Sequence, residues 1–585
     1  FDVCGVPFPR RRPPIVLVIV TQIILKAWHN VNRATRNLSI SLHPLAASLL
    51  TVHPNQSCTS SFVLPPAWKC WWDWAAQSPY EFEEDVPWRL LLRYYTQYSP
   101  GSRWDDQYSC IPLEIRSLLD SARRLKMSRE QGSTMLSATG GLASQILESE
   151  GHEAVTEPAK NDKLHGMSPK KSHEVLCMTE YTSRLLSASH QLKSLRHVVD
   201  VGAGQAYLSR RLRDDLKLEV LALDWSDVQT RGAARKDALT QKKRRMENPL
   251  RTAYDVADVN DALIVEGENV PPRKNDTPEN IPHESGSSQL TGTGSLTYKT
   301  INITTESLIE ATNEWMSDQT RAEQKSGPTP LAFVALHACG SLTLHIIRAF
   351  ITSLRSDNSS KVWVPTLAIV VGCCYNLMDI KDFPLSSELS SSSPDTPTVT
   401  LTSNHLQLAA QIPSQWSRTD SALNAAKLAM KKVVWRALLE GFLEQCKTNQ
   451  PTVADTAGGA EDHTPSTTGS KNAKPHDRVR RVGKLNDSAY AEWAIYLERA
   501  GAKLGMSLMQ AGERDLQMER RLEVFHVLRC ILGPVVETLI LLDRYRWLEE
   551  ELSGTGMEIK LVNLFDQASG SGRNIAITIS SPSCQ

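Results

Sequence analysis

Hydrophobic positions in the first third of the chain recur at helical spacing. In IPLEIRSLLDSARRLKM (111–127), the apolar residues Ile115, Leu118, Leu119 and Leu125 recur at helical intervals. Residues at such intervals line one face of an α-helix, which buries that face against the rest of the protein. The pattern predicts a helical region.

The GMSPKKSHEV stretch predicts the start of another helix. Ser168 is a suitable N-terminal cap and Pro169 suits the first helical position. Val175, Leu176 and Leu185 then fall on one buried face of that helix.

From residue 197 the pattern changes to short, continuous apolar runs. HVVDVGAG (197–204) ends in a glycine loop, AYLSRRLRDDL reads as the helix that follows, and KLEVLALDW (217–225) is a second strand ending in an acid. This order marks an open parallel α/β sheet. Three more strands are expected at 296–304, 331–340 and 366–374, and MEIKLVNLF with NIAITIS predicts a terminal hairpin added to the sheet.

Polar, low-complexity stretches divide the chain. Helices are expected at 422–445, 488–504 and 520–552, the last kinked or interrupted by Pro534. The expected organisation is a poorly defined segment (1–79), a helical N-terminal region (80–165), the sheet core (166–385) with a largely disordered insertion at about 230–295, linkers plus a helix (386–485), and C-terminal helices with the hairpin (486–585).

Composition narrows the classes of function. The chain has 585 residues, with 65 Lys and Arg against 65 Asp and Glu, so no global attraction to nucleic acid or to an acidic membrane is expected. Eleven cysteines, an odd number with no CxxC pair, argue against a disulfide framework and a zinc ribbon. We expect an intracellular protein of the cytoplasm or nucleus that does not bind membranes.

Residues 10–26 put a basic cluster before a short apolar run, which resembles a signal-peptide pattern. The run is about half of the roughly 20 residues that a spanning helix needs, and no convincing cleavage site follows. A signal and an imperfect start to the chain are both compatible with this pattern, and we give it no functional weight.

The glycine loop carries the main functional signal. Asp200, Gly202 and Gly204 form an acid-x-Gly-x-Gly pattern after the first strand, and Asp224 ends the next strand, where it can accept hydrogen bonds from a ribose. Dinucleotide enzymes favour a third glycine where this chain has Tyr207, whereas S-adenosylmethionine enzymes favour the acid. The pattern therefore favours S-adenosylmethionine; a glycine turn that binds nothing is the structural alternative.

Two further stretches place reactive side chains just after apolar strands, where the ligand crevice of an open α/β sheet lies. These side chains belong to His337, Cys339, Cys373, Cys374, Tyr375 and Asn376. A metal site is the alternative, but H-x-C with a distant C-C is no known tetrahedral spacing, so we expect no metal. The two adjacent cysteines can also be small packing residues beside a tight turn, and we expect no disulfide between them.

Together, GMSPKKSHEV, VVDVGAGQAYLS, LALDW, LHACGSLT and VGCCYNLM, with the later FPLSS, LRCILGPVVETLILLDRYRWLEE and LFDQASGSGRN, resemble the methyltransferase-like protein 25 family. The resemblance covers blocks from about 82 to 580. It implies a seven-stranded, Rossmann-like S-adenosylmethionine-dependent methyltransferase, with the terminal hairpin as the last two strands. The H-x-C-G and C-C pattern also looks like that of transfer RNA 2′-O-methyltransferases, which makes RNA a candidate substrate by analogy.

This chain departs from the family at three places. Ala206 stands where a third glycine is usual, Ser341 stands where an aspartate usually follows H-x-C-G, and the S-P-R-N motif appears as SGRN, which keeps Arg573 and Asn574. These departures make a catalytically inactive relative the competing interpretation.

The hypothesis from the sequence is a methyltransferase that binds S-adenosylmethionine with Asp200, Gly202, Gly204 and Asp224. His337, Tyr375 and Asn376 would orient or deprotonate the acceptor, an RNA or a protein, with His337 as the base. The alternative is an inactive scaffold that binds RNA or protein through the basic run 234–251, where Lys242, Lys243, Arg244 and Arg245 can neutralise phosphates. Such a run is more commonly a solvated insert.

Overall fold

The structure is a computed structural model, and it describes residues 44–77, 86–98, 108–132, 134–137, 167–247, 294–323, 327–356, 361–390, 400–448, 482–508 and 512–581. The chain divides into two compact units, and each is discontinuous in sequence. The helical unit comprises Phe1–Ser128 and Tyr375–Trp547, and the sheet unit comprises Arg129–Cys374 and Leu548–Gln585. The signal-like stretch lies outside the described residues.

The sheet unit is built on one sheet, which has eight strands among the described residues, in the order β1-β7-β8-β6-β5-β2-β3-β4. The neighbouring strands from β4 to β6 are parallel, whereas β8 is antiparallel to both of its neighbours and β1 to β7. The strands are β1 (Thr134–Ser137), β2 (His197–Val201), β3 (Glu219–Asp224), β4 (Leu296–Thr300), β5 (Thr329–Cys339), β6 (Trp363–Cys373), β7 (Glu558–Asn563) and β8 (Ile575–Ser580).

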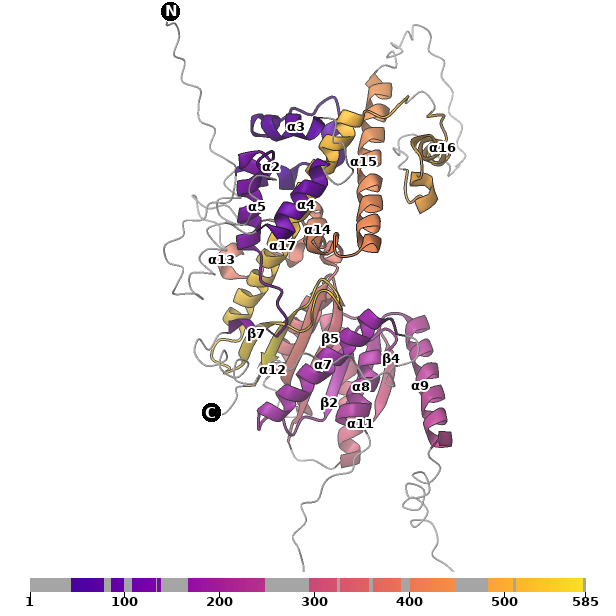
Figure 1. Cartoon of the computed structure of the whole chain (residues 1–585). Coiled ribbons are helices and arrows are strands. Elements are labelled where there is room, and N and C mark those ends of the chain that lie inside the picture. Colours follow the sequence, from indigo (N-terminus) through magenta and orange to yellow (C-terminus); the bar gives the residue numbers. More distant parts are fainter. Residues whose placement is uncertain are drawn as a thin grey trace, which may run out of the picture. The chain divides into compact units, whose positions relative to one another are not determined.

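Helices cover both faces of this sheet, which explains why its central strands are mostly apolar and largely buried. Val198 of β2 packs in a cluster with residues of α7 and α8. Figure 1 shows these two helices against the sheet. His197, the preceding residue, contacts Trp315 of α11 with its ring edge. Because successive strand residues point to opposite faces, α11 lies on the other side. These helices are α7 (Pro169–Ala188), α8 (Tyr207–Leu216), α9 (Asp227–Glu247), α11 (Thr305–Glu323) and α12 (Leu342–Arg355).

The seven strands expected from the sequence are all present, and the α/β fold class is confirmed. Ser168 caps α7 as expected, accepting a hydrogen bond from the Lys171 amide. The sequence did not predict β1, which adds an eighth strand at the edge of the sheet. Residues 230–247, expected to open a disordered insertion, belong instead to α9. The rest of that insertion lies outside the described residues.

The helical unit contains a tryptophan cluster. Trp68, Trp71 and Trp72 surround Phe525, with ring centroids 4.8 to 6.4 Å from its own. Part of the expected undefined segment is thus well-packed helix. The α-helices are α2 (Pro44–Thr51), α3 (Lys69–Ala76), α4 (Pro87–Gln97), α5 (Leu113–Leu125), α13 (Ser387–Ser390), α14 (Ser403–Ala409), α15 (Asp420–Thr448), α16 (Trp493–Leu504) and α17 (Leu516–Glu551, shared with the sheet unit).

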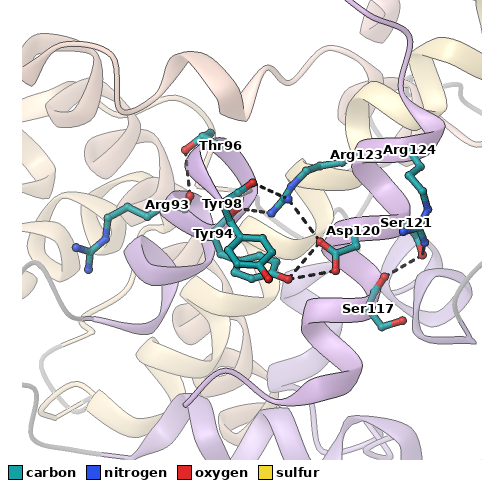
Figure 2. A network of polar contacts seen from close by, with 9 residues as sticks. All are labelled: Arg93, Tyr94, Thr96, Tyr98, Ser117, Asp120, Ser121, Arg123 and Arg124. Carbon is teal, nitrogen blue, oxygen red and sulfur yellow. Dashed lines mark hydrogen bonds and ion pairs between the residues drawn. The ribbon is translucent and has the colours of Figure 1, made fainter. Parts of the chain in front are cut away.

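Short 3-10 helices connect these elements: η2 (Pro54–Cys58), η3 (Pro66–Trp68), η5 (Tyr375–Leu377), η6 (Ile380–Asp382), η7 (Pro413–Gln415) and η8 (Asp487–Tyr490). A polar network joins α4 to α5 (Figure 2). The Arg123 guanidinium donates to the backbone oxygens of Tyr94 and Tyr98 and lies 4.8 Å from the Tyr94 ring centroid. Asp120 accepts a hydrogen bond from the Tyr94 hydroxyl at 3.1 Å. Arg123 of α5 therefore anchors the C-terminal end of α4.

Helix α17 continues through Pro534 without interruption. By length and composition it could cross a membrane, but 89% of its most apolar window is buried inside the protein, as in the core helix of a soluble protein. It also buries charged residues, including Arg529 and Asp543. Its apolar character is therefore explained by burial in the protein.

Candidate functional site

Four neighbouring parallel strands bring the candidate residues of the sheet unit to one edge. The glycine loop follows β2, Asp224 ends β3, His337 and Cys339 lie at the end of β5, and Cys373 ends β6. The chain order reverses between β2 and β5, and in open α/β sheets the ligand crevice lies at such a reversal, outside the carboxyl ends of the strands.

The loop after β2 has the conformation that its glycines permit. Gly202 has φ +76° and Gly204 has φ +55°, values that side chains with a Cβ rarely adopt. The Gly202 and Ala203 amides both donate to the Leu223 carbonyl at 2.9 Å, which fixes the loop over β3. A Cβ at Gly204 would have no atom within 4 Å, so a ligand can approach its backbone.

Asp200 is buried beneath this loop. Its carboxylate accepts a 2.5 Å hydrogen bond from the Ser209 hydroxyl of α8. Burial raises the pKa of Asp200 to about 6, although the Ser209 hydrogen bond opposes the shift. Asp200 therefore takes up a proton at a higher pH than an exposed aspartate does.

Asp224 connects two loops. Its Oδ2 accepts from the Gly204 amide and its Oδ1 from the Ser226 amide, both at 2.8 Å. The next residue, Trp225, is 77% exposed. The indole therefore presents a flat apolar face beside the carboxylate at the end of β3. The sequence analysis missed this residue, although LDW contains the signal.

Ala206 takes the left-handed conformation, with φ 52°, that a glycine would adopt without strain. Its methyl group is buried in a small cluster with Ala222 of β3 and Ala233 of α9. The substitution for glycine therefore fills a packing position between the loop and α9.

His337 lies on a β-bulge of β5. Leu336 and His337 together oppose one residue of β6, because the register shifts between Ala335 and Ala338. Bulges re-aim side chains and are frequent beside active sites. The His337 Nε2 lies 3.0 Å from Oε2 of Glu174, a buried residue of α7, while 37% of the imidazole is exposed. Glu174 is a second residue that the sequence analysis missed.

Three thiols meet next to His337. The Sγ atoms of Cys339 and Cys373 are 3.2 Å apart, and with Cys374 all three lie within 4.8 Å of one another. The pKa of Cys339 is lowered to about 6, chiefly because its thiolate accepts hydrogen bonds from Cys373 and Cys374, and the charge of the Arg573 guanidinium adds to this effect. The pKa of Cys373 is raised, chiefly by the hydrogen bond that it donates to Cys339.

Two of the remaining predicted residues belong to the other unit, and the basic run belongs to α9. Tyr375 and Asn376 belong to the helical unit. There the Tyr375 ring is buried and the Arg544 guanidinium carbon lies 5.7 Å from its centroid, whereas Asn376 is exposed. Their roles as acceptor-orienting groups stay predictions. In the basic run, Lys242 is exposed on α9; the side chains of Lys243, Arg244 and Arg245 lie outside the described residues.

Ser341 and the SGRN segment can also be placed. Ser341 precedes α12, and its side chain makes no cap hydrogen bond to that helix. The Asn574 side chain is fully buried and donates to the Phe565 carbonyl at 2.7 Å. Asn574 therefore holds the hairpin loop in place.

Comparison with known proteins defines the class. A family model described as a methyltransferase domain matches residues 170–381. The human probable methyltransferase-like protein 25 is 23% identical over 477 residues, which are 66% of this chain and 70% of the relative. The mouse protein of the same name is 24% identical over 481 residues, 68% and 73% respectively. No solved structure matches at a comparable level of significance.

The sheet, its glycine loop and the family match define a methyltransferase domain with a Rossmann-like fold. Within that class, the chain is a divergent relative of the methyltransferase-like protein 25 proteins, so the resemblance predicted from the sequence is confirmed. The terminal hairpin completes the sheet, as that resemblance implied.

Proposed function

We propose that the protein is an S-adenosylmethionine-dependent methyltransferase whose acceptor is an RNA or a protein. The observation that carries the proposal is the glycine loop tied to Asp224 at the reversal of strand order. A ligand can approach the backbone of this loop closely, and the Asp224 carboxylate at the end of β3 is available to accept hydrogen bonds from a ribose.

The chain's own groups fit the parts of this cofactor. Each Asp224 oxygen accepts one backbone hydrogen bond and has a second lone pair for a ribose hydroxyl. The exposed indole of Trp225 offers a flat apolar face for the adenine. When bound, S-adenosylmethionine supplies an electrophilic methyl group on its sulfonium.

His337 is the group that we assign to deprotonate the acceptor. With Nε2 donating to Glu174, the imidazole keeps Nδ1 as an acceptor for a proton. The buried carboxylate orients the ring and stabilises its protonated form. A hydroxyl or amine of the acceptor is the class of nucleophile that this base would serve.

Calorimetric titration of S-adenosylmethionine into the full chain tests the cofactor proposal. Trp225→Ala should weaken binding by about 5- to 150-fold, since stacking of a base on an aromatic side chain contributes about 1–3 kcal/mol. Val228→Ala, 76% exposed nearby on α9, is the matched control and should bind like the parent chain.

A folded chain that binds no S-adenosylmethionine would refute the proposal and leave the inactive scaffold in its place. Equal affinity in both variants would show that the adenine does not stack on Trp225. Incubation with a labelled methyl donor and separated RNA and protein fractions then identifies the acceptor class.

A further inference from the structure

The proposed methyl transfer assigns no role to the three clustered cysteines, Cys339, Cys373 and Cys374. Cys339 and Cys373 are direct neighbours across the parallel strands β5 and β6. The Gly340 amide donates to the Cys373 carbonyl at 3.0 Å, which extends the strand pairing to the end of both strands. Two of the thiols are therefore held side by side by backbone hydrogen bonds.

Cys374 joins them through an unusual backbone conformation. Successive residues of a strand point to opposite faces, so a regular strand would separate the thiols of Cys373 and Cys374. Cys374 has φ 48°, the left-handed region, which costs about 1–3 kcal/mol in a residue with a side chain. This turn allows all three Sγ atoms to lie within 4.8 Å of one another. Strain held at a cluster of reactive groups is typical of a functional site.

We propose that Cys339, Cys373 and Cys374 bind one zinc ion through three thiolates, with a fourth position open to water or a small ligand. Thiolates around a tetrahedral zinc lie about 3.8 Å apart, from Zn–S bonds of about 2.3 Å. The sulfur–sulfur distances in the cluster are close to this value. The Sγ atoms of Cys339 and Cys373 are 3.2 Å apart, and no pair among the three is more than 4.8 Å apart.

The surroundings fit such an ion. Three thiolates and Zn²⁺ carry a net charge of −1, and the Arg573 guanidinium acts electrostatically on both Cys339 and Cys374. Cys373 is buried while the other two cysteines are partly exposed, which leaves an approach for a fourth ligand. Soft thiolates select zinc over magnesium or calcium. His337 is not one of the proposed ligands, because its Nε2 lies 3.0 Å from the Glu174 carboxylate.

The metal content of the full-length chain tests this proposal independently of S-adenosylmethionine binding. Purification without chelator should give about one zinc per chain by plasma mass spectrometry, as a structural or catalytic site requires. Cobalt substitution should produce thiolate–cobalt absorption with tetrahedral bands. Cys339→Ser, Cys373→Ser and Cys374→Ser should each weaken zinc binding by more than the roughly 10–100-fold that loss of an outer partner costs. Cys70→Ser, which alters an exposed thiol of the helical unit, should bind normally.

A measurement on the unmodified chain guards against variants that fail to fold. Added zinc should slow iodoacetamide labelling of Cys339 and Cys374, as mapped on peptides, and a chelator should restore it. The proposal would be overturned by a folded chain that contains no zinc, shows no thiolate–cobalt absorption and is labelled by iodoacetamide at the same rate with and without zinc. An intact mass two hydrogens low with Cys339 linked to Cys373 would also overturn it, since the cluster would then be a redox pair.

Discussion

At the scale of single residues, the site contains carboxylates whose burial lowers the stability of the folded chain unless they have partners. Glu174 is 2% exposed and His337 reaches it from a bulged strand. A buried carboxylate without a partner is strongly destabilising, so the pair has a structural as well as a chemical reason to exist.

Glu174→Gln should reduce methyl transfer by about 10- to 100-fold, because it keeps a hydrogen-bond acceptor but removes the charge that stabilises protonated His337. Affinity for S-adenosylmethionine should not change. Single-turnover kinetics with calorimetry separate the two effects, and His190→Ala, an exposed histidine of the same unit, is the control. Unchanged turnover would exclude the histidine as the base.

Asp200 gives a pH dependence. Its folded-state pKa of about 6 exceeds the ordinary value of 3.8, so the folded chain binds more protons between about pH 4 and 6. Stability from this group is therefore lost as pH rises through that window, by about 3 kcal/mol in all. Asp200→Asn should raise the urea midpoint at pH 7.5 and lose this advantage towards pH 4. Asp215→Asn, at an exposed position, should show no such trend, and a constant difference across pH would contradict the prediction.

At the scale of elements, an ion pair anchors α9, a helix whose polar and basic composition resembles that of a solvated insertion. Arg213 of α8 contacts both oxygens of Asp237 of α9, at 2.7 and 2.9 Å. Both side chains are buried. This pair, with Ala233 against Ala206, holds α9 on the sheet unit.

Asp237→Ala should destabilise the chain by about 1.5–3 kcal/mol, because the buried Arg213 would lose two charge-assisted hydrogen bonds and keep only Asp214 as an ionic partner. Denaturant unfolding followed by circular dichroism measures the loss. Asp215→Ala breaks the more exposed pair with Arg211 and should cost no more than about 1 kcal/mol. Similar losses in the two variants would mean that α9 is not anchored by Asp237.

Local patterns predicted much of the fold, and long-range contacts explain what they missed. The β2 strand, its glycine loop and β3 are contiguous in sequence, so their order was readable. Strand β1 has four residues and pairs with β7, more than 400 positions away. Glu174 lies 163 positions from His337. Such partners are chosen by the tertiary fold, which a single sequence does not display. Helix α9 was missed because its many basic residues resemble a solvated insert.

At the scale of the whole molecule, the methyltransferase sheet is assembled from two distant stretches of chain. The family model ends at 381, whereas β7 and β8 come from residues 558–580. Strand β8 pairs with the buried strand β6. The matched region is therefore shorter than the unit that forms the sheet.

A chain that ends at residue 552 should be insoluble or bind a hydrophobic dye strongly, because β6 would become an unprotected apolar edge. A chain that ends at residue 581 keeps both strands and should behave like the parent. Solubility and dye fluorescence of the two truncations decide the matter; a soluble, dye-silent shorter chain would show that the hairpin is dispensable.

The position of β8 near the C-terminal end of the sequence also delays the pairing of β6 during synthesis. Val371 of β6 pairs with Ala576, and 576 − 371 = 205 residues separate them. At about 5–20 residues per second, a ribosome takes about 10–40 s to deliver the partner strand. During that interval the nascent chain carries an open edge of aliphatic residues. The order in which this protein's strands are made therefore leaves β6 without its antiparallel partner for that interval.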